Sequence, residues 1–323
     1  MGLWKSLRHR VEVMACQVLL RGVVRLNRRQ CLGFSQLLGA CVYHLDSRGR
    51  KVALANLQSV FPNKERSWHR QTARRSYQNF ARTMLDLFWS KKVGKNNFSQ
   101  FIEVNGFQEL MERACKEGRG VVFACAHLGN WEWAGLAFAH IGGQASIVAQ
   151  DFKNPALTGL FAQMRSHGKH KLISQAGAML RLLKTVIRGG NTALLADLTL
   201  LPHQGPTVLK AFGPEPLEIC ATQMHAVLAQ RGNALLVPVL TEPQPHGRVL
   251  VTALPPIETA GLSTSEIAQK TWDVFEKAIL AKPELWLWPY KHFRFRPKNA
   301  RRPYPFYSSV SEAFDSIRDT GTT

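Results

Sequence analysis

His127 and Glu132 are the residues whose types and spacing best suit catalysis. They lie in the stretch 121–135, VVFACAHLGNWEWAG, where an apolar run leads into His127 and the acidic side chain follows five positions later. A histidine accepts a proton near neutral pH, and a neighbouring carboxylate stabilises the imidazolium that forms. The two side chains therefore indicate general-base chemistry, with His127 as the base and Glu132 as its partner.

The spacing requires a turn between the two side chains. Positions five apart on a helix lie about 140° apart, so His127 and Glu132 would diverge on a continuous helix. Gly129 permits a tight turn, and Asn130 is a favourable N-cap for a helix that begins at Trp131. We therefore expect a strand, a loop that carries His127, and a helix with Glu132 in its first turn. The same spacing fits equally well a helix-capping Glu beside a loop histidine that has no catalytic role.

An alternation of strand-like and helix-like runs predicts the sheet that would position this loop. The strand-like runs are 121–125, 145–149, 192–196, 235–240 and 248–253, and the helix-like runs are 131–140, 155–167, 176–188, 217–231 and 264–281. This order favours an α/β fold with a mostly parallel sheet flanked by helices. Open sheets of this kind place their sites at the carboxyl ends of the strands, where His127 falls.

The N-terminal segment has the pattern of a basic amphipathic helix. Its apolar residues recur at helical spacing between residues 11 and 26 and are surrounded by arginines, which is typical of binding to a membrane surface. The next apolar run, 31–45, is shorter than the roughly 20 residues that a spanning helix needs. We expect membrane-associating helices at 1–47, a catalytic domain at 48–303 and a polar, frayed tail at 304–323. A span, or helices that merely cover the core, are the alternatives.

The charge distribution also favours an anionic surface as a partner. The net charge is +20, and residues 1–75 hold 15 Lys and Arg against three acidic residues, about +12. Residues 290–303 add six basic residues and no acidic ones, so the middle of the chain is nearly balanced. No zinc-finger spacing, RNP motif or heptad-linked basic region supports binding to nucleic acid. The six cysteines form no CxxC pair and indicate reduced thiols in a cytosolic compartment.

The string HLGNWE at 127–132 resembles the signature of the bacterial lipid A late acyltransferases, the lauroyl and myristoyl transferases of lipopolysaccharide synthesis. This family lies within the lysophospholipid acyltransferase-like superfamily. The resemblance extends over most of the chain, through RKVALANLQSVFP at 50–62 and PELWLWPYKHFRFRP at 283–297. Two positions depart from the family pattern: Leu198 stands where Gln is usual, and AFG at 211–213 replaces two Phe before the Gly.

The resemblance implies transfer of an acyl group from a thioester to a hydroxyl group, with His127 as the base and Glu132 as its orienting partner. The amides around Gly129 and Asn130 would then bind the oxyanion. Arg165 matches an arginine that follows the signature and would bind substrate phosphate, and Asp197 would hold Arg165 or a sugar hydroxyl.

The resemblance also implies partners and a place in the cell. The donor would be acyl carrier protein or coenzyme A carrying the acyl group, the acceptor an anionic glycolipid such as a lipid A precursor, and no metal or cofactor is expected. The enzyme would work at the cytoplasmic face of the bacterial inner membrane. The sequence leaves open another acceptor, such as a phosphatidylinositol mannoside, an ornithine lipid or a lysophospholipid. It also leaves open a catalytically idle member that serves as a membrane scaffold.

Overall fold

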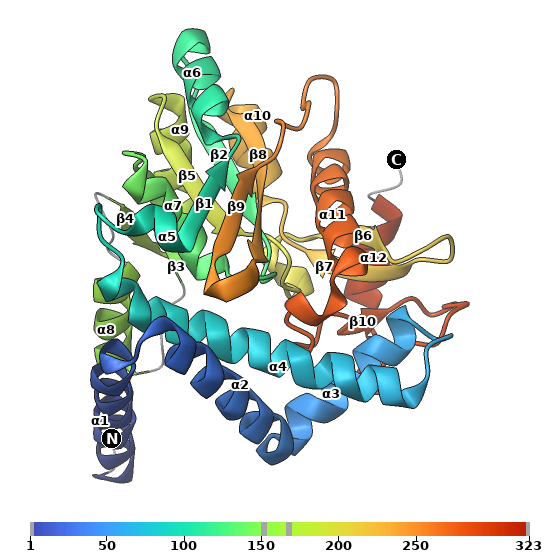
Figure 1. The fold of residues 1–323 in the computed structure, drawn as a ribbon. Coiled ribbons are helices and arrows are strands. Elements are labelled where there is room, and N and C mark those ends of the chain that lie inside the picture. The colour runs from blue at the N-terminus through green and yellow to red at the C-terminus, as the bar shows by residue number, and fades with distance from the viewer. Residues whose placement is uncertain (1–2, 150–153, 166–169, 321–323) are drawn as a thin grey trace.

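The computed structural model describes residues 3–149, 154–165 and 170–320. Its centre is a seven-stranded sheet with the strand order β1-β9-β8-β2-β5-β3-β4 (Figure 1). The strands of this sheet are β1 (Ile102–Asn105), β2 (Val121–Cys125), β3 (Ala145–Ala149), β4 (Lys171–Ser174), β5 (Asn191–Leu195), β8 (Leu235–Pro243) and β9 (Val249–Ala253). Neighbouring strands are parallel except for the antiparallel pair β8 and β9. The predicted α/β fold with a mostly parallel sheet is confirmed.

Helices cover both faces of the sheet, and each face has its own hydrophobic core. The covering helices are α5 (Phe98–Phe101), α6 (Phe107–Glu117), α7 (Trp131–His140), α8 (Pro155–Arg165), α9 (Ala178–Ile187), α10 (Met224–Arg231) and α11 (Thr264–Ala281). Strand β2 is buried along its whole length because its side chains alternate between the two cores. Val122 faces the core shared with α9, α10 and α11, and Phe123 faces the core shared with α6 and α7.

The first four helices of the chain lie together on the side of the sheet where strand β2 ends (Figure 1). They are α1 (Leu3–Arg25), α2 (Arg28–Leu45), α3 (Ser47–Val60) and α4 (Arg66–Trp89). Helix α4 runs past the end of β2 that leads into the His127 loop, and α2 packs on α4. The contact is close at Gly39, where a Cβ atom would lie 2.4 Å from the Cα of Gln78.

The exposed surface of α1 carries an apolar stripe. Its members are Leu7, Val11, Met14 and Val18, each at least half exposed. The second half of the helix instead buries Leu20 and Val23. The predicted single stripe is therefore divided between the protein core and the surface. None of the helices in the described residues is both long enough and apolar enough to cross a membrane.

Two sequence-based expectations are wrong. The run 217–231 is not one helix, because Leu217–Ala221 form strand β7, which pairs with β6 (Thr207–Ala211) before α10 begins. The segment 304–323 is not a frayed tail within its described part. It contributes β11 (Ser309–Val310), which pairs with β10 (Phe295–Arg296), and helix α12 (Glu312–Thr320). Phe314 of α12 is fully buried against Phe295.

Candidate active site

The loop between β2 and α7 carries His127 at the predicted place. Parallel strands β2 and β5 lie side by side, and the Ala196 amide donates to the Cys125 carbonyl at 2.8 Å. This register brings the residues that follow the two strands together at the carboxyl ends of the strands. His127 and Asp197 therefore meet, although 70 positions separate them in the sequence.

Asp197 holds His127 from two sides. One carboxylate oxygen lies 2.8 Å from Nδ1 of His127, and the other accepts the backbone N–H of His127 at 2.9 Å. The indole N–H of Trp286 also donates to Asp197, at 2.9 Å. Because an ionised carboxylate only accepts hydrogen bonds, Nδ1 carries the proton and Nε2 keeps its lone pair. His127 is thus held in the tautomer that a general base needs.

The environment keeps Asp197 ionised. The side chain is fully buried, and burial alone would raise the pKa of the carboxyl. The positive charge that His127 carries when protonated, together with the hydrogen bonds from His127 and Trp286, outweighs burial and holds this pKa below its ordinary value. The prediction that Asp197 binds Arg165 is wrong, because its partners are His127 and Trp286.

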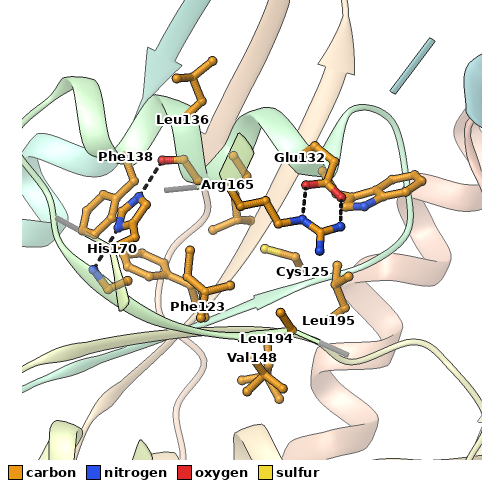
Figure 2. Close-up of a pocket in the computed structure, with 18 of the residues that line it drawn as sticks. Phe123, Cys125, Glu132, Leu136, Phe138, Val148, Arg165, His170, Leu194 and Leu195 are labelled. Atoms are coloured by element: carbon orange, nitrogen blue, oxygen red, sulfur yellow. Dashed lines mark hydrogen bonds and ion pairs between the residues drawn. The ribbon is translucent and has the colours of Figure 1, made fainter. Parts of the chain in front are cut away.

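Glu132 has a different partner from the one expected. Its two carboxylate oxygens accept hydrogen bonds from Nε and Nη2 of Arg165, at 2.9 Å and 2.6 Å, as Figure 2 shows. Burial alone would lower the pKa of the Arg165 guanidinium, but Glu132 outweighs burial and raises it. The role of Glu132 as the orienting partner of His127 is therefore corrected: Asp197 orients the base, and Glu132 orients Arg165. The residues that follow Arg165, 166–169, lie outside the described part of the chain.

Gly129 shapes the loop rather than presenting its amide to a substrate. Its φ is +63°, and a Cβ atom would lie 1.9 Å from the Thr241 carbonyl oxygen, so only glycine fits. Its N–H donates to the Leu285 carbonyl at 3.0 Å, and its own carbonyl accepts from Thr83 at 2.9 Å. The expectation that this amide binds the oxyanion is wrong.

Asn130 caps α7, as predicted, and its side chain is buried. Its Oδ1 accepts the N–H of Trp133 at 3.3 Å, and its Nδ2 donates to Asp86 of α4 at 2.7 Å. These contacts direct the side-chain amide into the protein, and binding of the oxyanion by the backbone amide of Asn130 stays a prediction.

A cavity of about 580 Å³ begins beside His127 and extends between the sheet and α7. At its open end lie Phe80, His127 and Arg165, which retain partial solvent exposure. The rest of the wall is almost wholly apolar and includes Phe123, Cys125, Leu136, Phe138, Ala145, Ile147 and Leu194. A volume of this size is typical of a site for a small molecule or a lipid chain.

His170 and Phe138 line the part of the cavity farther from Glu132, and their rings stack with an interplanar angle of 7° (Figure 2). His170 Nε2 donates to the Gly135 carbonyl at 2.8 Å, and its Nδ1 accepts the Ala145 N–H at 3.1 Å. Both nitrogens are thus occupied, and the imidazole lines the cavity as a rigid wall.

Sequence reasoning missed several residues that support the site. Asn79, Thr83 and Asp86 lie on the inner face of α4, where Asn79 and Thr83 donate to the Gly129 carbonyl and Asp86 accepts from Asn130. Trp286 was part of a motif that the resemblance identified, but its contact with Asp197 was not predicted. The available signal was three polar residues at helical spacing on the apolar side of the segment 66–89.

A histidine held by a buried carboxylate beside an apolar cavity, at the carboxyl end of an α/β sheet, suits an enzyme that uses a general base on a substrate with an apolar chain. The chain matches the family model described as bacterial lipid A biosynthesis acyltransferase over residues 3–295. It therefore belongs to that family and is an acyltransferase. A comparison with curated proteins gives no match.

Proposed function

We propose that this enzyme transfers a fatty acyl group from acyl carrier protein to a hydroxyl group of an anionic glycolipid, such as a lipid A precursor. The observation that carries the proposal is the His127–Asp197 pair at the open end of the apolar cavity. A base at the mouth of a long apolar site suits a substrate with a reactive head and a hydrocarbon tail.

The chemistry needs one base and no covalent enzyme intermediate. His127 Nε2 takes the proton of the acceptor hydroxyl, whose oxygen attacks the thioester carbonyl carbon. The tetrahedral intermediate then collapses, the carbon–sulfur bond breaks, and the leaving thiolate takes the proton from His127. Asp197 stabilises the transient imidazolium. The first N–H groups of α7, at Trp131 and Glu132, have no acceptor within the helix and are suited to bind the oxyanion.

The acyl chain would lie in the cavity. Each buried methylene contributes about 0.8 kcal/mol, so a twelve-carbon chain gains roughly 9 kcal/mol of gross burial free energy. The wall formed by His170 and Phe138 would limit the chain length, because a longer chain meets packed side chains.

Arg165 would bind an anionic group of the acceptor or of the donor's phosphopantetheine arm. Its Nε and Nη2 donate to Glu132, and Nη1, which has no acceptor among the described residues, would donate to a phosphate oxygen. The ion pair fixes the guanidinium at the cavity mouth before substrate arrives, which reduces the conformational entropy lost on binding.

The N-terminal helices would hold the enzyme at the cytoplasmic face of the inner membrane. The exposed apolar stripe of α1 is accompanied on the same helix by Arg8, Arg10, Arg21 and Arg25, all exposed. This combination favours binding to anionic lipid by apolar insertion and electrostatic attraction together. In the other concentration of basic residues, 290–303, Phe293 is buried, as are the preceding Trp286 and Trp288, so these three side chains cannot insert into lipid.

Lipid mass spectrometry of cells with and without the active enzyme tests the proposal. We expect a lipid species heavier by one fatty acyl group in cells with wild-type protein and its absence with His127→Ala. Acylation of a neutral lipid, an ornithine lipid or a lysophospholipid would overturn the glycolipid acceptor, and acylation of a phosphatidylinositol mannoside would overturn the lipid A precursor as the acceptor. Each result would leave the acyl transfer intact.

A further inference from the structure

A buried charge network lies directly beneath the start of α7. Asp86 of α4 is fully buried and accepts hydrogen bonds from Arg28 Nη1 and Nη2, the latter at 3.0 Å. Arg82 adds a second cation at 3.6 Å. On its other side Asp86 accepts from Asn130 Nδ2 at 2.7 Å, three residues after His127. A buried carboxylate that joins two arginines to a loop amide fixes the relative positions of all its partners.

Arg28, which binds Asp86, also contacts three other parts of the protein. Its guanidinium lies over the rings of both Trp89 and Trp133, at 5.0 Å and 4.8 Å from their centroids. Its Nε and Nη2 also donate to the Gly247 carbonyl in the turn between β8 and β9, at 3.0 Å and 2.6 Å. A Cβ atom on Gly247 would lie 2.7 Å from Arg28 Nε, so this turn fits the arginine closely. One side chain from the first turn of α2 thus joins α4, α7 and the turn between β8 and β9.

We propose that Asp86 and Arg28 are positioning residues for the loop that carries His127. The proposal rests on the proposed function in one respect, because it takes His127 as the base. Asp86 orients the Asn130 side chain, and it also accepts the indole N–H of Trp133 through its backbone carbonyl at 3.0 Å. Both contacts fix the first turn of α7. The loop 126–130 is short, so the position of this turn determines where His127 meets the substrate.

Three variants separate positioning from folding. Asp86→Asn removes the carboxylate that both arginines contact. Asn130→Ser keeps an N-cap oxygen but is too short to reach Asp86, and it leaves the ion pairs of Arg28 intact. Tyr77→Phe is the matched control, because it removes a hydrogen bond of 2.8 Å between α4 and Asp46 that does not touch the loop.

We expect Asp86→Asn and Asn130→Ser to lower kcat by about 10- to 100-fold, with KM for the acyl donor unchanged within about twofold. The double variant should have a kcat no lower than that of the less active single variant, because both changes remove the same link between Asp86 and Asn130. Tyr77→Phe should lower the melting temperature and leave kcat unchanged. A lower melting temperature with unchanged kcat in Asn130→Ser would overturn the proposal.

Hydrogen–deuterium exchange gives a readout that does not depend on activity. We expect the amides of residues 127–133 to exchange faster in Asp86→Asn and Asn130→Ser than in the wild type. In Tyr77→Phe their exchange should match that of the wild type. Unchanged exchange in the first two variants would overturn the positioning role. If the wild type transferred no acyl group, the proposed function would fail, and the exchange data would still decide whether Asp86 positions the loop.

Discussion

Nδ1 of His127 lies 2.8 Å from the Asp197 carboxylate, whereas the Glu132 carboxylate, five residues from His127, is bound by Arg165. The chain therefore builds two separate pairs at the cavity mouth. One pair activates a base, and the other holds a cation. This division assigns different roles to the two carboxylates, and their substitution should have different effects.

Asp197→Asn should lower kcat by about 10³- to 10⁴-fold. An asparagine no longer stabilises the imidazolium, and its amide donor favours the tautomer with the proton on Nε2, which cannot accept the hydroxyl proton. Steady-state kinetics at saturating donor measures this effect.

Glu132→Gln provides the comparison, and we expect a loss of about 10-fold because His127 keeps its partner. Glu276→Gln is the matched control, since Glu276 accepts hydrogen bonds from Phe212 and Trp272 on the far side of the sheet. A larger loss for Glu132→Gln than for Asp197→Asn would reverse the two roles.

Gly135→Ala should shift the preference toward shorter acyl chains. Gly135 lines the cavity on α7, and an added Cβ would lie 3.6 Å from Ile147 and 4.0 Å from His170, which is ordinary contact. The fold tolerates the methyl group, but the acyl chain loses its space. We expect the rate with the longest accepted donor to fall about 10-fold relative to a donor two carbons shorter.

A series of acyl carrier proteins with different chain lengths measures the shift. Gly159→Ala on α8 is the control, because a Cβ atom there meets nothing within 4 Å and lies outside the cavity. An unchanged chain-length profile in Gly135→Ala would show that the acyl chain does not occupy this cavity.

Liposome binding should depend on two separable contributions of α1. Replacing Leu7, Val11, Met14 and Val18 with Gln should leave binding to anionic vesicles that high salt reverses completely, because only the electrostatic part remains. Replacing Arg8, Arg10, Arg21 and Arg25 with Gln should weaken binding and reduce its dependence on salt, because part of the electrostatic attraction is removed.

Sedimentation with vesicles at low and high salt measures both effects. Complete release of the wild-type protein by salt would contradict apolar insertion of α1. Release only by detergent after the apolar replacements would place the anchor elsewhere, and α2 exposes Leu37 and Leu45 for that purpose.

Acid should destabilise the protein through His225. Its side chain is buried, neither ring nitrogen has a hydrogen-bond partner among the described residues, and burial lowers its pKa from 6.5 to about 4. Below pH 6.5 the unfolded chain binds a proton that the folded protein excludes, so stability falls as the pH drops toward 4. The shift corresponds to about 3 kcal/mol.

The variant His225→Met should therefore unfold at a higher temperature than the wild type at pH 5, with a smaller difference at pH 7. His292 has a pKa lowered to about 4 by burial and retains its own share of the acid sensitivity in this variant. Thermal unfolding from pH 4 to 8 checks the result. An equal pH dependence in both proteins would contradict the burial of an uncharged His225.

The sequence predicted the parts of the site that local patterns encode. The apolar run before His127 indicated a buried strand, and Gly129 and Asn130 indicated the turn and the cap that the structure contains. The main strands were predicted because each is an apolar run of at least five residues. The four-residue strands β1 and β4 were missed because such short runs do not stand out from loops.

The pairing of the charged side chains could not be predicted in the same way. Glu132 is near His127 in the sequence, and this proximity favoured Glu132 as the carboxylate that pairs with His127. The carboxylate that actually pairs with His127 is set by the order of the strands in the sheet. Only the adjacency of β2 and β5 brings Asp197 to His127. The α8 end likewise brings Arg165 to Glu132. Phe314 was expected in a polar tail because burial of a single aromatic residue has no local signature.

The rate of acyl transfer by His127→Ala tests the central claim most directly. The account predicts that kcat with an acyl carrier protein donor falls by about 10²- to 10⁴-fold, because the acceptor hydroxyl keeps its proton. The variant should fold normally, because the side-chain hydrogen bond of His127 joins it to Asp197 within the site itself. The His127 side chain is 15% exposed. A rate within twofold of the wild type would contradict the assignment of His127 as the base.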